Sequence, residues 1–151
     1  MAVIPAPAQV TAPADMPEKD VELLRAAELL LAACWVGGRH EVATALRTAD
    51  GGVFTGVHLE GSCRRSSICA EGVALGAARG GLPAGAPLAV DVVVSVQIKP
   101  ADTFRIIAPC GVCRELISDY SPDATVWLTT GDGPAPMKAL DLLPEKTRRA
   151  W

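Results

Sequence analysis

Cys69-Ala70-Glu71 and Pro109-Cys110-Gly111-Val112-Cys113 are the two stretches that decide how this chain is interpreted. Together they supply three thiols and one carboxylate. Cysteines at i and i+3 lie on one face of a helix, close enough to bind the same ion. A structural zinc site uses four protein ligands, whereas a catalytic site typically has three and keeps one position for water. The three cysteines therefore predict a Zn²⁺ site with an open position, beside which Glu71 is free to move protons.

Other interpretations of these cysteines stay open at this point. A Cys-x-x-Cys pair alone is also typical of a structural zinc site, and Cys110 and Cys113 could instead form a disulfide bond. Cys63 as a fourth ligand would close the metal site and abolish hydrolysis. Three thiolates on Zn²⁺ leave a net charge of about −1, so we expect Arg114 to donate a hydrogen bond to a thiolate. The alternative is that Arg114 is a surface residue of its helix.

The composition describes one domain with an aliphatic core. Half of the 151 residues are hydrophobic, 4% are aromatic, and the formal net charge is −3. This acidic balance predicts no nucleic-acid partner, and no apolar run predicts a membrane span. Five cysteines, three of them in a metal-type spacing, favour a reducing compartment, so we expect a cytoplasmic protein. Prolines among alanines predict a disordered or loosely packed tail over 1–17, followed by one zinc-dependent domain over 18–151.

The hydrophobic pattern alternates helices with strands, which predicts an α/β layered sheet. Helices are expected over 17–35, 67–79, from residue 110 and over 137–143; strands are expected over 42–47, 53–60, 90–98, 105–107 and 124–128. The segment 131–136 is expected to be a loop. In the strand 53–60, alternate residues from Val53 face the core, so His58 and Glu60 project together from the other face. The helix over 67–79 is apolar nearly all round, which predicts burial.

The motifs resemble those of small, single-domain cytidine deaminases of the three-cysteine zinc type. The resemblance covers about 37–144 and rests on Phe54-x-Gly56-x-His58-x-Glu60, Cys69-Ala70-Glu71, Pro109-Cys110-Gly111-Val112-Cys113-Arg114 and Leu142-Leu143-Pro144. It implies a three-layer α/β/α sandwich with a mixed central sheet, and a homo-oligomer, with a tetramer favoured over a dimer. It also implies that Cys69, Cys110 and Cys113 bind Zn²⁺, that Glu71 shuttles protons, and that Glu60 binds a ribose hydroxyl.

Departures from that family lie on the side of the site that would hold the sugar. His58 replaces an asparagine, and His40 replaces an aromatic residue that stacks near the pyrimidine. Arg64 and Arg65 precede a helix N-terminus, where cations are unfavourable by about 0.3–1 kcal/mol unless an anion offsets the dipole. An anionic group on the substrate would do so, which resembles deaminases of nucleoside antibiotics such as blasticidin S. Alternatively, these arginines contact another subunit or solvent.

The sequence thus predicts a zinc-dependent hydrolytic deaminase of a cytosine nucleoside, or of a modified or anionic relative, that releases ammonia. Its partner is a small nucleoside-like molecule. One alternative is an aminohydrolase acting on another small amino-heterocycle, because the zinc site does not identify the ring. Another is a catalytically silent zinc-binding relative, although a purely structural site needs no carboxylate such as Glu71 beside it.

Overall fold

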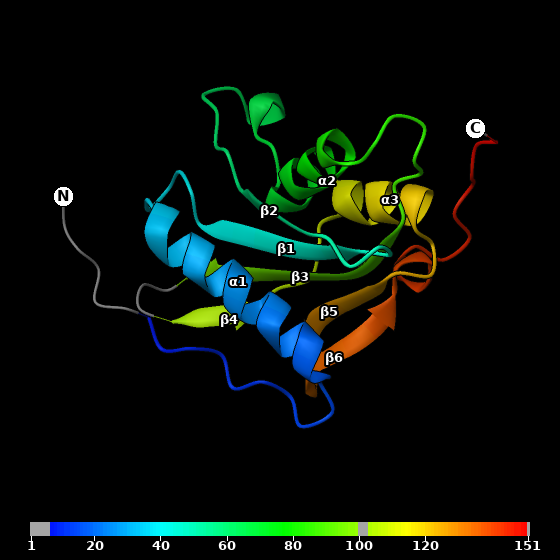
Figure 1. The fold of residues 1–151 in the computed structure, drawn as a ribbon. Helices are drawn as coiled ribbons and strands as arrows, with labels where there is room; N and C mark the ends of the chain where they lie inside the picture. Colours follow the sequence, from blue (N-terminus) through cyan, green and yellow to red (C-terminus); the bar gives the residue numbers. More distant parts are fainter. Residues whose placement is uncertain (1–6, 100–102, 151) are drawn as a thin grey trace.

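One mixed six-stranded sheet organises the chain in the computed structural model, which describes residues 7–99 and 103–150 (Figure 1). Its strands follow the order β2-β1-β3-β5-β6, with β4 paired to β3. Only β3 and β5 run parallel among the described pairs, and the others are antiparallel. The elements are α1 (Glu18–Cys34), β1 (Val42–Thr48), β2 (Val53–Val57), η1 (Arg64–Ser66), α2 (Ala70–Gly81), β3 (Val90–Ile98), β4 (Phe104–Ile106), α3 (Gly111–Tyr120), β5 (Thr125–Thr130), β6 (Gly133–Lys138) and η2 (Ala139–Leu142).

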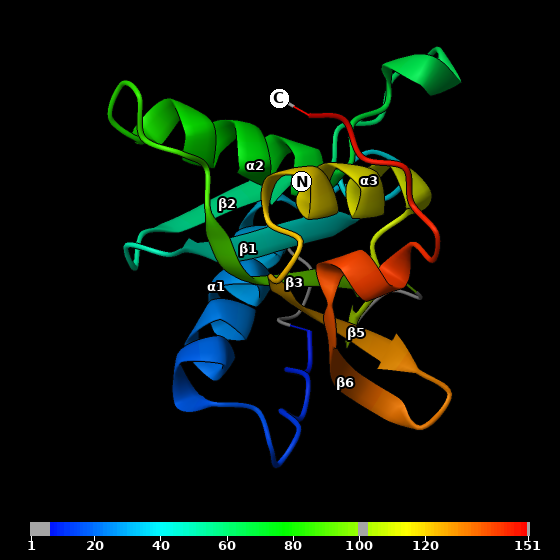
Figure 2. The same ribbon diagram turned by 90° about the vertical axis from the view of Figure 1, so that its right-hand side faces the viewer.

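Helices cover both faces of this sheet. Figures 1 and 2 show α1 on one face and α2 with α3 on the other. Each face has its own apolar cluster, since Leu24 of α1 packs with Val94 of β3, whereas Leu75 of α2 packs with Val93. Alternate residues of a strand point to opposite faces, so a strand covered on both sides is apolar throughout. The predicted three-layer α/β/α sandwich with a mixed central sheet is confirmed.

Helix α1 begins directly after Pro17, as expected, and its first turn carries the acidic residues Glu18 and Asp20. Negative side chains are favourable at a helix N-terminus. Asp20 is buried and accepts hydrogen bonds from Arg47 on β1, at 2.7 Å, and from the indole of Trp127 on β5, at 2.8 Å. This carboxylate therefore ties α1 to two strands of the sheet.

The structure corrects the expectation of a loop over 131–136. Residues 133–138 form the edge strand β6, which pairs antiparallel with β5 and contains Pro134 and Pro136. Proline lacks a backbone N–H and is accepted at a sheet edge, where one side of the strand has no neighbour. The two prolines therefore lie in an edge strand and not in the expected loop.

The predicted strand 53–60 is shorter and faces differently from what was expected. It ends at Val57. Leu59, which was expected to face the core, is 45% exposed, whereas Gly56, which was expected on the other face, lies buried against α2. The predicted helix over 67–79 begins three residues later, at Ala70, because 67–69 are extended up to the cap residue Cys69. It is also not buried all round, since Gly76 and Ala77 are exposed.

Residues 7–17 of the predicted tail contact the domain. The backbone N–H of Val10 donates to Glu28 of α1 at 2.7 Å, and Met16 is buried in the cluster beneath α1. Residues 1–6 of that tail, and Trp151 at the other end, lie outside the described residues. The boundary at residue 17 stays a prediction. Among the described residues, no helix is long and apolar enough to span a membrane.

Candidate active site

Two helix N-termini bring the three cysteines together. Cys69 is the cap residue of α2, Cys110 is the cap residue of α3, and Cys113 lies in the first turn of α3. The Cys110 sulfur lies 3.5 Å from that of Cys69 and 3.6 Å from that of Cys113. Because both helices cover the same face of the sheet, residues far apart in sequence form one cluster.

The cluster has the dimensions of a tetrahedral thiolate site. Zinc–sulfur bonds of about 2.3 Å in a tetrahedron place the sulfurs about 3.8 Å apart. The three sulfurs here all lie within 4.8 Å of one another, and all five cysteines of the chain are free thiols. The predicted alternative of a disulfide is therefore wrong for this structure. Cys63 is exposed and does not belong to the cluster, so among the described residues three thiols could hold a metal ion together.

Glu71 lies beside the thiols and is almost fully buried, at 4% exposed. Its Oε2 atom is 3.4 Å from the Cys113 sulfur, and its Oε1 accepts a hydrogen bond from Ser95 of β3 at 3.0 Å. The Ser95 hydroxyl in turn lies 2.7 Å from that of Thr44 on β1. Sequence reasoning did not identify Ser95 and Thr44. The available signal was a serine within the valine run of β3 and a threonine between alanines of β1.

The thiols differ in how readily they ionise without a cation. The pKa of Cys69 is raised to about 11, mainly by burial and to a smaller extent by the neighbouring Cys110. Burial also raises the pKa of Cys113, and the Glu71 carboxylate raises it further. Burial opposes ionisation of Cys110 too, but backbone N–H groups at the start of α3 and the other two thiols outweigh it and lower its pKa. A bound divalent cation reverses this preference, because a coordinating thiol is deprotonated.

Arg114 contacts backbone carbonyls. Its Nε donates to the Pro109 carbonyl at 2.8 Å, and its Nη1 donates to the Leu142 carbonyl at 3.3 Å. Pro109 directly precedes Cys110, so Arg114 fixes the approach to the cap residue of α3 and ties it to η2. A hydrogen bond from Arg114 to a thiolate stays a prediction.

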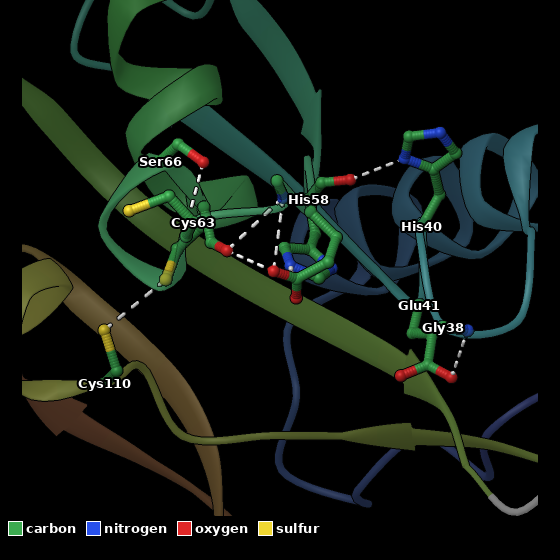
Figure 3. A network of polar contacts seen from close by, with 11 residues as sticks. Gly38, His40, Glu41, His58, Cys63, Ser66 and Cys110 are labelled. Atoms are coloured by element: carbon green, nitrogen blue, oxygen red, sulfur yellow. Dashed lines mark hydrogen bonds and ion pairs between the residues drawn. The ribbon is translucent and has the colours of Figure 1, made fainter.

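The structure brings His58 and Glu60 together. The Nε2 atom of His58 lies 3.4 Å from Oε2 of Glu60, and Ser67 donates a hydrogen bond to Oε1 of the same carboxylate. The Ser67 hydrogen bond is the largest cause that lowers the pKa of Glu60, and the nearby His58 adds to it. His40 lies to one side of His58 and donates from Nδ1 to the His58 carbonyl at 2.8 Å (Figure 3). Glu60 is therefore a fixed, ionised hydrogen-bond acceptor.

The two predicted arginines lie in η1, the short turn that leads toward Cys69. Arg65 is exposed, and the Arg64 side chain lies outside the described part of the structure. Exposed apolar side chains flank the cysteines: Ile68 precedes Cys69 and pairs with Leu59, and Val112 lies between Cys110 and Cys113.

Comparisons with known proteins agree with this geometry. No protein-family model matches the sequence. A blasticidin-S deaminase from Bacillus cereus is 32% identical over 136 residues, which covers 87% of this chain and 94% of that protein. A cytidine deaminase from Halalkalibacterium halodurans is 34% identical over 91 residues, 60% of this chain and 63% of that protein. The crystal structure of cytidine deaminase from Burkholderia pseudomallei superposes with a TM-score of 0.69 at 29% identity, covering 87% of this chain and 100% of that one.

Proposed function

The chain belongs to the cytidine deaminase family, and we propose that it is a zinc-dependent hydrolase that deaminates a cytosine nucleoside with an anionic sugar group. The observation that carries this proposal is the buried Glu71 carboxylate, 3.4 Å from a sulfur of a three-thiol cluster. A carboxylate that is buried beside metal ligands, but is not one of them, is suited to acid–base work.

Each residue of the site has a distinct task in this reaction. Cys69, Cys110 and Cys113 would hold Zn²⁺, which lowers the pKa of a bound water and supplies hydroxide near neutral pH. Glu71 accepts the proton of the attacking water and delivers it to the ring nitrogen next to the amino-bearing carbon. As the carbon–oxygen bond forms, the π bond between that carbon and the protonated ring nitrogen breaks. Glu71 then transfers the second proton of the attacking water to the amino group, the bond between the carbon and the amino nitrogen breaks, and ammonia leaves as the carbonyl forms. The products are ammonia and the corresponding uracil nucleoside.

Glu60 and His58 are suited to the sugar. Glu60 is ionised and held by Ser67, so its carboxylate can accept a hydrogen bond from a sugar hydroxyl. Arg65, with Arg64 beside it in sequence, supplies the positive charge for an anionic group such as a carboxylate. The 32% identity to a blasticidin-S deaminase supports the same substrate class.

The apolar residues around the site support an oligomer. Leu59 is 45% exposed, Ile68 is 48% exposed and Val112 is 69% exposed. Three large apolar side chains beside a reactive centre are suited to contact with another subunit. We therefore propose a homo-oligomer, with a tetramer favoured, which light scattering of the purified protein would test. Free thiols in the metal site further support a cytoplasmic location, where cysteines stay reduced.

Ammonia release by the zinc-loaded protein tests the proposed substrate class. The panel contains blasticidin S, cytidine, deoxycytidine, cytidine monophosphate, cytosine and several amino-purines. We expect an anionic cytosine nucleoside to be turned over with a kcat/KM at least about tenfold above that of cytidine, which corresponds to about 1.4 kcal/mol. Arg65→Gln should remove that preference and leave cytidine unaffected, whereas Lys138→Gln, at the far edge strand, should change neither.

Three outcomes would contradict the proposed function or its substrate. Cytidine turned over as well as any anionic nucleoside would make the chain an ordinary cytidine deaminase. Deamination of amino-purines alone would assign the site to another heterocycle. Absence of turnover across the panel by zinc-loaded protein would support a catalytically silent relative.

A further inference from the structure

Two buried hydroxyl groups lie beside aliphatic side chains on one face of the sheet. Thr44 of β1 and Ser95 of β3 lie directly opposite each other in the antiparallel register, and both are buried, at 0% and 2% exposed. Two residues farther along the same strands and on the same face, Leu46 and Val93 pack into the apolar cluster under α2 and α3. Buried hydroxyls are unfavourable unless they are hydrogen-bonded, so this pair needs an explanation.

The direction of the hydrogen bonds follows from the number of available protons. Ser95 has one hydroxyl proton, and it donates that proton to Oε1 of Glu71 at 3.0 Å. The 2.7 Å contact between the Thr44 and Ser95 oxygens must then use the proton of Thr44. The chain of donors therefore runs from Thr44 through Ser95 to the carboxylate of Glu71.

This chain makes the two carboxylate oxygens of Glu71 unequal. Oε1 points at the sheet and is occupied by Ser95, whereas Oε2 points at the cysteine cluster, 3.4 Å from the Cys113 sulfur. A single hydrogen bond on Oε1 restricts rotation of the carboxylate about its terminal bond. Thr44 in turn restricts the Ser95 hydroxyl, which otherwise could rotate away from Glu71.

We propose that Ser95 and Thr44 are positioning residues, which hold Glu71 in one orientation so that Oε2 alone faces the reacting atoms. This inference rests on the proposed function, and it adds two residues that neither motif of the site contains. Both hydroxyls lie on central strands, which are rigid elements, so they orient Glu71 from behind without touching substrate. A proton carrier held in its working orientation avoids the loss of rate that misplacement causes.

Four variants separate positioning from structural support. Ser95→Ala removes the donor to Glu71, and we expect kcat to fall by about 10- to 100-fold while KM stays within about twofold. Thr44→Val removes the second hydroxyl with little change in shape, and kcat should fall by about three- to tenfold. Thr44→Ser keeps the hydroxyl and should match the wild type. The double variant Thr44→Val/Ser95→Ala leaves no orphaned hydroxyl and should be no slower than Ser95→Ala, because Thr44 acts through Ser95.

A second readout does not depend on turnover. The carboxyl-carbon NMR resonance of Glu71, assigned through Glu71→Gln, should move in zinc-loaded Ser95→Ala and Thr44→Val and stay in place in Thr44→Ser. All variants should bind one zinc per chain. An unmoved resonance in Ser95→Ala would overturn the inference even if the wild type deaminated no substrate tested. If the wild type is active, two kinetic results would overturn the inference as well. One is an unchanged kcat in Ser95→Ala, and the other is a kcat in the double variant that is lower than in Ser95→Ala.

Discussion

Gly56→Ala tests a close backbone contact between the sheet and the helix that carries Glu71. Strand β2 passes α2 at Gly56, where a Cβ atom would lie 2.5 Å from the Ala74 nitrogen and 2.6 Å from the Ala70 oxygen. Both are backbone atoms of α2, so no rotamer change can relieve the clash. Ala70 lies between Cys69 and Glu71 in sequence, so the added methyl group presses directly on the start of the helix.

The size of the effect follows from these distances. Ordinary van der Waals contact begins at 3.4 Å, so strand and helix must separate by roughly 1 Å. Overpacking of this kind typically costs about 1–3 kcal/mol of unfolding free energy. A displacement of about 1 Å at a catalytic group can lower the rate by about 10²-fold. We therefore expect Gly56→Ala to lose stability and about 100-fold in kcat/KM, because the movement reaches Glu71.

Urea unfolding and ammonia release from blasticidin S measure the two effects. The matched control is Gly76→Ala, since Gly76 is exposed in the same helix and a Cβ there would meet nothing within 4 Å. Replacing a helical glycine by alanine should stabilise the protein by about 0.5–1 kcal/mol and leave kcat/KM unchanged. The reasoning about this contact would be refuted if Gly56→Ala kept its unfolding free energy within about 0.5 kcal/mol of the wild type and its kcat/KM within about threefold.

Two further substitutions probe charged groups outside the metal cluster. Lys146→Met should lower the unfolding free energy, measured in urea, by about 1–3 kcal/mol, since the Lys146 side chain is 2% exposed and its ammonium pairs with Asp119 at 2.8 Å. Lys138→Met, an exposed control, should change the unfolding free energy by less than about 1 kcal/mol. Equal effects of the two would contradict this. Ser67→Ala should raise the pKa of Glu60 toward 4.5, measured by NMR titration. The pKa of Glu60 is lower in the folded protein than its ordinary value of 4.5. Its contribution to stability is therefore present above pH 4.5 and is lost as the pH falls through the folded pKa. An unchanged pKa of Glu60 in Ser67→Ala would count against the Ser67 contact.

Local spacing was enough to predict one half of the cysteine cluster, whereas Cys69 was assigned through the motif that it forms with Glu71. Cysteines at i and i+3 share a helix face wherever that helix lies, so the pairing of Cys110 with Cys113 needed no knowledge of the fold. The alternation of apolar residues from Val90 to Ile98 with partly polar neighbours likewise predicted the strand β3. The motif resemblance then supplied the layered architecture, which the structure confirms.

Features that depend on distant partners were missed. The strand character of Pro134 and Pro136 depends on β5, which supplies the hydrogen-bonding neighbour. Thr44 and Ser95 acquire a role only because β1 and β3 align them in register beneath Glu71. The local signal for such a pairing is weak, since a threonine or serine within a strand is common without any such role.

Zinc content and turnover of Glu71→Gln, measured beside the wild type, test the central claim most directly. Glutamine keeps the shape of Glu71 but cannot accept and deliver a proton. We expect both proteins to bind one zinc per chain, and ammonia release from the preferred cytosine nucleoside to fall by about 10²–10⁴-fold in the variant. Loss of zinc from Glu71→Gln would instead make Glu71 part of the metal site. Turnover equal to the wild type, with zinc bound, would contradict its role as the proton carrier.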